Sequence, residues 1–141
     1  MEPLISVIIL WLSLTFAFPT APERPQVRHV PPQHLTSIRF GRVVGAGHDQ
    51  NILGAYDARS QTIFLRDDWD SRNAADVSVL VHELVHFLQD RASWSYECPG
   101  EREALAYEAQ QRWLQLFGKS LESAFDLDAM TLKLRTACLP Y

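Results

Sequence analysis

The sequence predicts a small α+β domain in which strands come first and helices follow. Two short β-prone runs, at residues 51–57 and 61–66, flank a polar turn, as in a hairpin. Segments with helical periodicity fill the second half, from about residue 74 onward. A chain of 141 residues, 47% of them hydrophobic, suits one domain with one modest core. We therefore expect a small antiparallel sheet, or a single hairpin, packed on a layer of helices.

Residues 1–21 form a hydrophobic N-terminal segment that we expect to be a signal peptide. Its uncharged run from Leu4 to Phe18 has the length of a signal-peptide core and is short for a membrane span. Small residues allow cleavage after Ala17 or Ala21, although the residues before the run include Glu2 and no Lys or Arg. The segment predicts an exported protein, periplasmic or secreted. The alternative is a protein anchored to the membrane by an uncleaved segment.

Residues 22–36 are predicted to be a proline-rich linker, and residues 37–141 the folded domain. Five of the eight prolines lie between residues 19 and 32, a composition typical of extended linkers. The β-branched and apolar run at 37–44 then precedes Gly45-Ala46-Gly47, which predicts a strand ending in a glycine turn.

Three helical segments follow the predicted hairpin. The first is expected from about residue 74 to 91, after several Asp, Ser and Asn residues that suit a helix N-cap. The second is expected from residue 101 to 117 and ends at Gly118, a favourable residue after a helix. The third, from about residue 120 to 136, has a predicted break near Asp126.

The motif that carries the functional prediction is His82-Glu83-Leu84-Val85-His86. Residues four apart project from the same helix face, so the two histidines could bind one Zn²⁺ while Glu83 reaches a water on it. The surrounding residues 78–90 are mostly apolar, as expected for a buried helix. Burying two imidazoles and a carboxylate there is costly unless something offsets their desolvation, and a metal ion would do so.

Two histidines need a third protein ligand to form a catalytic zinc site. The metallopeptidase class with a third histidine is excluded, because Gln89 and Ala92 occupy the positions that its glycine and histidine would take. The other common solution is a glutamate on the next helix, where the chain offers Glu101, Glu103 and Glu108.

With these residues the sequence resembles the gluzincin metallopeptidases, which carry HExxH on one helix and E-x-x-A on the next. It is most similar to small relatives such as the CAAX-prenyl endopeptidases and the ImmA/IrrE-type peptidases, and to exported bacterial proteins of unknown function built around VHELVH. The resemblance implies a minimal zincin-like fold. Matching E-x-x-A to Glu101–Ala104 implies Glu101 as the ligand, while the glutamate directly before Ala104 makes Glu103 the alternative. Several such enzymes have an aspartate where this chain has Leu105, so a carboxylate that orients a histidine must come from elsewhere or be missing.

The expected function is therefore a zinc-dependent metalloendopeptidase. Zinc held by the two histidines and Glu101 would activate a water, and Glu83 would act as the general base. The strand at 61–65 could bind an extended peptide by edge pairing. Three side chains are candidates for stabilising the oxyanion, namely Tyr96, Tyr107 and His48.

The alternative function is a zinc-stabilised binding or inhibitory domain without catalysis. An inert metal site would not need Glu83, so the motif favours the enzyme. A net charge of −4 without a basic stripe excludes general nucleic-acid binding. The expected partners are a peptide or protein substrate, with membrane contact only through an uncleaved N-terminal segment.

The two cysteines, Cys98 and Cys138, are a candidate disulfide. In an oxidising compartment they would join the segment after the motif helix to the C-terminus.

Overall fold

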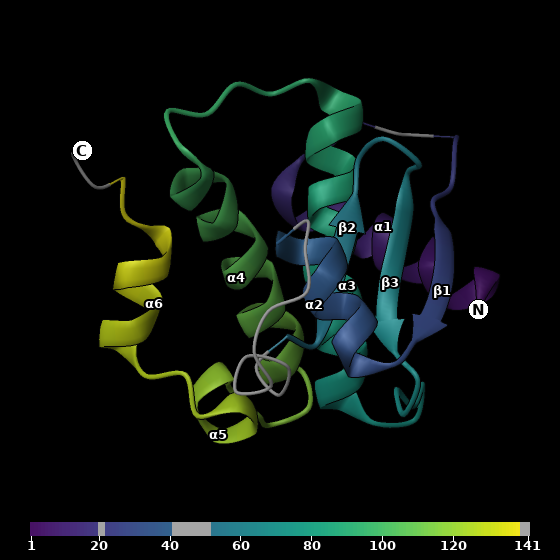
Figure 1. The fold of residues 1–141 in the computed structure, drawn as a ribbon. Helices are drawn as coiled ribbons and strands as arrows, with labels where there is room; N and C mark the ends of the chain where they lie inside the picture. Colours follow the sequence, from purple (N-terminus) through teal and green to yellow (C-terminus); the bar gives the residue numbers. More distant parts are fainter. Residues whose placement is uncertain (20–21, 41–51, 139–141) are drawn as a thin grey trace.

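The computed structural model describes residues 1–19, 22–40 and 52–138, and its elements confirm the predicted α+β class (Figure 1). In chain order they are α1 (Glu2–Phe16), β1 (Gln26–Val30), α2 (Pro32–Phe40), β2 (Gly54–Asp57), β3 (Thr62–Arg66), α3 (Ala74–Ala92), α4 (Pro99–Gln115), α5 (Leu121–Phe125) and α6 (Ala129–Thr136).

The three strands form one mixed sheet in the order β1-β3-β2. The predicted hairpin is confirmed, because β2 and β3 pair antiparallel with Gly54 opposite Leu65. The expectation of a purely antiparallel sheet is wrong, because β1 pairs parallel with β3, with Val27 opposite Ile63. The central position of β3 also corrects the expectation that the strand at 61–65 binds a peptide. Both of its edges are already paired, since β1 lies on one side and β2 on the other.

Strand β1 and helix α2 occupy the segment that was predicted to be a linker. The prolines of this segment flank the strand at Pro25 and Pro31, and therefore do not interrupt its hydrogen bonds. Pro32 is the first residue of α2, where a proline is well tolerated because that backbone N–H has no helical partner. Residues 37–40 are helical, so the predicted strand at 37–44 is wrong over this part. Its remainder and the glycine turn lie outside the described residues.

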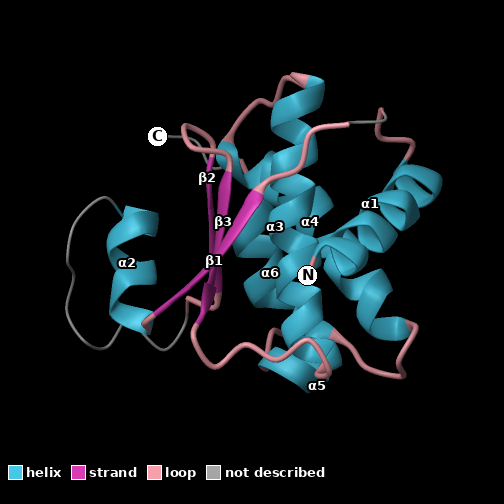
Figure 2. Cartoon of the chain, turned by 90° about the vertical axis from the view of Figure 1, so that its right-hand side faces the viewer, coloured by secondary structure: helices cyan, strands magenta, loops and turns pink. Residues whose placement is uncertain are grey.

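The elements stack in layers, with α2 on one face of the sheet, α3 and α4 on the other, and α1 outermost beyond them (Figure 2). Strand β3 alternates between the faces: Ile63 and Leu65 belong to the main core with α3, and Phe64 packs with Leu35 of α2. The main core thus lies around α3. Thirteen consecutive residues of that helix, Val77 to Gln89, are buried.

The helices of the second half agree with their predictions. Helix α3 begins after Asn73, whose side chain accepts hydrogen bonds from the backbone N–H groups of Ala75 and Asp76. The end of α4 is followed by Gly118 with φ 72°, a conformation that favours glycine. The predicted break at Asp126 is confirmed, because this residue has φ 57° and separates α5 from α6.

Helix α1, which covers most of the predicted signal peptide, is packed into the domain. Its buried residues belong to the main core together with α3 and α4; they are Ile5, Ile8, Ile9 and Leu12. Phe18, which follows the helix, is only 4% exposed and belongs to the same core. No helix among the described residues is long and apolar enough to cross a membrane.

The predicted disulfide is present: Cys98 and Cys138 are bonded, with their Cα atoms 5.7 Å apart. It joins the N-cap residue of α4 to the segment just after α6.

Candidate metal centre

The two motif histidines lie on the face of α3 that is turned toward α4. Their side chains are only 7% and 8% exposed, for His82 and His86 respectively. The imidazole rings stand 5.0 Å apart, one helical turn from each other. Because the helix is buried all round, the rings are held by packing as well as by hydrogen bonds.

Glu103 of α4 lies between the two histidines. Its Oε2 is 3.0 Å from Nε2 of His82, and its Oε1 is 2.9 Å from Nε2 of His86. The donor atoms of these three residues all lie within 4.8 Å of one another. Helices α3 and α4 therefore bring two imidazole nitrogens and a carboxylate to one point.

Glu101, the ligand expected from the E-x-x-A match, does not reach this point, whereas Glu103, the alternative, does. Glu101 is exposed, and its carboxylate accepts a hydrogen bond from the backbone N–H of Glu97 at 2.9 Å. The reason is the orientation of α4, which turns toward the core the face that carries Ala106, Gln110 and Trp113. Residues spaced three, four and three apart share a helix face, and this series begins at Glu103.

Two buried glutamines hold the outer nitrogens of the imidazoles. Nδ1 of His82 lies 2.9 Å from Oε1 of Gln110, and Nδ1 of His86 lies 2.8 Å from Oε1 of Gln89. Amide oxygens accept hydrogen bonds, so each imidazole donates from Nδ1, and Nε2 is the nitrogen that would bind a metal after losing its proton. This is the tautomer that a metal bound at Nε2 requires.

The glutamines are themselves anchored. Gln110 donates from Nε2 to the hydroxyl of Ser78 at 3.2 Å, and Gln89 donates from Nε2 to the carbonyl of Arg102 at 3.0 Å. Sequence reasoning missed both roles. The available signal was the same helix geometry, because Gln110 lies seven residues after Glu103 and Gln89 three residues after His86. The neutral amides of these two glutamines thus orient the histidines, a role that a carboxylate has in several similar enzymes.

Glu83 is 3% exposed and lies where β2 crosses α3. A Cβ added at Gly54 would be 2.8 Å from Cγ1 of Val79 and 3.3 Å from Cγ of Glu83, so only glycine allows this close approach. The Oε1 atom of Glu83 is buried and has no hydrogen-bond partner among the described residues. An unpaired buried carboxylate oxygen is costly, which indicates that a further group belongs beside it.

Of the three oxyanion candidates, the structure brings one to the histidines. The ring of Tyr107 packs edge-on against His82 with 4.7 Å between ring centroids, and its hydroxyl accepts a hydrogen bond from Nη1 of Arg135 at 3.0 Å. Tyr107 also lines a cavity of about 440 Å³ between α4, α5 and α6. Tyr96 lies beside Gln89, and burial raises the pKa of its hydroxyl. His48 lies outside the described residues.

The electrostatics of the metal-free site favour an ionised Glu103 next to protonated imidazole. Burial by itself would raise the pKa of Glu103, but the hydrogen bonds and charges of the two histidines outweigh it and hold that pKa far below its usual range. Burial likewise opposes protonation of His82, yet the hydrogen bond that its Nε2–H donates to Glu103 and the charges of Glu83 and Glu103 raise its pKa. The pocket is therefore suited to a cation.

The donor set fits a zinc ion. Zinc in proteins takes imidazole nitrogen and carboxylate oxygen at about 2.0–2.2 Å in tetrahedral geometry, which separates neighbouring ligand atoms by about 3.3 Å. Oε2 of Glu103 lies 3.0 Å from Nε2 of His82, and Oε1 lies 2.9 Å from Nε2 of His86, each somewhat less than that separation. Three protein ligands would leave a fourth position for a water.

Comparison with known proteins shows the family of the chain and adds no activity. No curated protein and no solved structure matches the chain. A family model matches residues 1–140, and the chain therefore belongs to the family described as the domain of unknown function DUF6647.

Proposed function

We propose that this protein is a zinc-dependent metalloendopeptidase of the gluzincin type, with His82, His86 and Glu103 as zinc ligands and Glu83 as general base. The observation that carries the proposal is the position of Glu103, whose two oxygens face the Nε2 atoms of both histidines. The buried and unpaired Oε1 of Glu83 is the second support, because a structural zinc site has no use for it.

In this proposal each residue has a defined task. Bound zinc would supply Lewis acidity and lower the pKa of a water toward neutrality. Glu83 accepts the proton of that water and then delivers it to the leaving amine. Gln89 and Gln110 accept the Nδ1–H of each imidazole, which keeps that proton on Nδ1 and directs Nε2 toward the metal position. Tyr107, held by Arg135, is the side chain best placed to donate a hydrogen bond to the oxyanion.

Strand β2 is the proposed docking edge for the peptide. It contacts α3 at Gly54, beside Glu83, and none of the described residues pairs with its outer edge. An extended peptide added there would lie beside the general base, with main-chain hydrogen bonds supplying affinity. The cavity bordered by Tyr107 offers room for a substrate side chain on the other side of the histidines.

A non-catalytic zinc domain is the second candidate function. It would use the same three ligands and the same glutamines, so the ligand geometry alone is compatible with it. Glu83 separates the two proposals, since binding of zinc without catalysis gives no reason to bury a carboxylate with an unpaired oxygen.

The test separates metal binding from catalysis with three variants of the full chain. Glu83→Gln should retain one zinc per chain by elemental analysis and lose peptide cleavage by at least about a hundredfold, because the general base is removed. Glu103→Ala should lose the metal, whereas Glu101→Ala should retain it and serve as the matched control. Cleavage is followed on a diverse peptide library by mass spectrometry, with and without chelator.

Each outcome decides a different part of the proposal. Purified protein without stoichiometric zinc contradicts the metal site. Metal loss on Glu101→Ala instead of Glu103→Ala contradicts the ligand set. Zinc binding by the wild type with no cleavage of any peptide leaves the non-catalytic domain as the function. Metal-dependent cleavage that is unchanged in Glu83→Gln contradicts the role of Glu83 as general base.

A further inference from the structure

Helix α1 has two apolar faces, and only one of them is covered by the described residues. The inner face carries Ile5, Ile8, Ile9 and Leu12, all at most 5% exposed, in the core with α3 and α4. On the opposite side lie Val7, Leu10 and Leu14, which are 59%, 61% and 78% exposed. Their spacing of three and four residues forms one continuous stripe along the helix. We call these three residues the outer stripe.

The inner face makes α1 an integral part of the domain. Trp11 packs edge-on against Trp113 of α4 with 5.2 Å between ring centroids, and Phe18 stacks on Trp94 at 4.7 Å. Removing the helix would expose the side of the α3–α4 core that carries Trp113. The family match also begins at residue 1, so α1 lies within the matched region.

The surroundings of the outer stripe have the chemistry of a helix lying at a membrane surface. The only charged residue of α1 is Glu2, at its first position. Arginines lie at both ends of the helix: Arg24 contacts Glu2 at 3.4 Å, and the guanidinium of Arg112 lies 5.1 Å from the ring centroid of Phe16. An uncharged stripe with an arginine at each end suits the interface between headgroups and acyl chains, and Arg112 also pairs with Glu108 at 2.8 Å.

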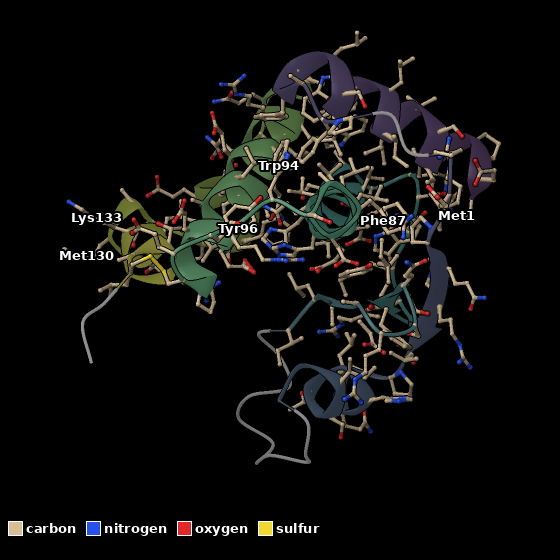
Figure 3. All side chains as sticks on the ribbon, turned by 90° about the horizontal axis from the view of Figure 1, so that it is seen from above. Met1, Phe87, Trp94, Tyr96, Met130 and Lys133 are labelled. Carbon is tan, nitrogen blue, oxygen red and sulfur yellow. A yellow bond between two sulfur atoms is a disulfide. The ribbon has the colours of Figure 1, made fainter. Side chains whose placement is uncertain are left out.

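The area of the stripe favours a lipid surface over a second copy of the chain. A 15-residue helix is about 22 Å long and, with side chains, about 10 Å wide, which gives roughly 220 Å² of footprint. A stable protein dimer buries about 800 Å² on each partner. Interfacial helices, in contrast, bind reversibly with a single apolar face and gain from anionic headgroups near arginine. The helix is also the outermost layer on its side of the molecule, as Figure 3 shows from above.

We infer that α1 remains in the folded protein and docks its outer stripe on an anionic lipid bilayer, lying in the plane of the membrane rather than across it. The metal site lies between α3 and α4, so it stays outside the bilayer in this arrangement. The inference stands independently of the proposed peptidase activity, because it rests on a different face of the molecule.

The experiment compares two double variants of the full chain. Leu10→Asp with Leu14→Asp changes the outer stripe. Met130→Asp with Leu134→Asp is the matched control, since these α6 residues are 69% and 62% exposed and Met130 lies far from α1 in Figure 3. Binding is measured by cosedimentation with vesicles of equimolar phosphatidylcholine and phosphatidylglycerol, and with phosphatidylcholine alone. Circular dichroism and thermal unfolding check that each variant is folded, and the serine substitutions at positions 10 and 14 replace the aspartates if either is not.

The wild type and the α6 variant should bind the anionic vesicles equally, and the α1 variant at least about tenfold more weakly. Absence of wild-type binding, or equal loss in both variants, overturns the inference. A wild-type dimer in sedimentation velocity that the α1 variant abolishes assigns the stripe to a second copy and also overturns it. Intact-mass analysis of protein from the producing cells must retain residues 2–18, and a chain starting after Ala17 or Ala21 refutes the retained helix.

Discussion

At the residue scale, the histidines of the centre are fixed on both nitrogens. Each imidazole has a glutamine at Nδ1 and Glu103 at Nε2, so neither ring can rotate without losing two hydrogen bonds. Such partners orient ligands and set their tautomer, and their removal commonly costs 10–100-fold in metal affinity. The amides are neutral, so they orient the histidines without adding charge to the centre.

This arrangement predicts the effect of changing Gln110. Gln110→Leu leaves the Nδ1–H of His82 buried without an acceptor, and the hydroxyl of Ser78 loses the hydrogen bond that Gln110 donates to it. We expect zinc affinity to fall by about 10–100-fold and the free energy of unfolding by about 1–3 kcal/mol. Competition with a fluorescent zinc chelator and urea unfolding measure the two effects. Gln110→Glu should restore most of the affinity because it restores the acceptor, and Gln115→Leu, at an exposed site on the same helix, should change neither quantity.

The same residues predict how the stability of the metal-free protein depends on pH. The pKa of Glu103 is lowered in the folded state, so its contribution is present above its ordinary pKa of 4.5 and is lost as the pH falls. The pKa of His82 is raised, so its contribution is present below its ordinary pKa of 6.5 and is lost as the pH rises through the folded value. Both contributions are present between pH 4.5 and 6.5.

Thermal unfolding of chelator-treated protein across pH 3–9 checks this window. Glu103→Gln should flatten the profile on both sides, because it removes the partner of each histidine. Glu101→Gln is the control, since that residue does not contact the histidines and should leave the profile unchanged. A profile that Glu103→Gln leaves intact would contradict the ion pairs.

These residues show which parts of the candidate metal centre could be predicted from the sequence. His82, Glu83 and His86 are fixed relative to one another by one helix, so the motif alone was sufficient to group them. The third ligand depends on which face α4 turns to α3, and the four-residue pattern around Ala104 carries no information on that. The burial of Ala106, Gln110 and Trp113 decides it, and a search for helix-face periodicity across the whole helix would have favoured Glu103.

At the element scale, the helices were predicted better than the first strand. Helices α3 and α4 have long periodic segments with clear N-terminal and C-terminal signals, which local sequence determines. Strand β1 is stabilised by parallel pairing with β3, a partner 36 residues further along the chain, and nothing in its own composition distinguishes it from an extended linker. The prolines around it support both interpretations.

Helix α6 depends on its connections to α4. None of its residues is buried. Its C-terminal end is held by the disulfide, and Arg135 reaches Tyr107 beside the histidines. The start of α4 and the segment after α6 lie close together, because a Cβ at Gly100 would collide with the carbonyl oxygen of Ala137. The disulfide therefore keeps one wall of the cavity next to the metal centre in place. It is compatible with an oxidising compartment, and the export of the protein stays a prediction.

Removing this disulfide should destabilise the domain and loosen α6 first. The cysteines are 40 residues apart, so the chain-entropy relation gives a loss of about 3–4 kcal/mol for Cys98→Ser with Cys138→Ser. Urea unfolding with and without a reducing agent measures it. The wild type should respond to the reductant and the double variant should not. Amide hydrogen exchange should accelerate in α6 before it accelerates in α3, and equal acceleration in both helices would contradict the role assigned to the bond.

At the scale of the whole molecule, helix α3, which carries the two histidines, is enclosed from two sides. The sheet covers α3 on one side, and α4 with α1 covers it on the other, so the site is built on the most buried helix of the domain. A rigid support of this kind keeps ligands in place when no metal is bound. The predicted linker is replaced by β1 and α2. The hydrophobic run of residues 4–18 suits a signal peptide and a core helix equally well, and its packing on Trp113 is what the second of these requires.

Neighbouring residues of α1 provide the sharpest test of this architecture. Ile8 is 0% exposed and Val7 is 59% exposed, although they are adjacent in sequence and similar in chemistry. Ile8→Ala should lower the free energy of unfolding by about 2–5 kcal/mol, because it leaves a cavity in the core. Val7→Ala should change it by no more than about 0.5 kcal/mol. Urea unfolding of the zinc-loaded and metal-free proteins measures both. Because α1 supports the core behind α3, Ile8→Ala should also release zinc at a lower urea concentration. Equal effects of the two substitutions would mean that α1 is not part of the folded core.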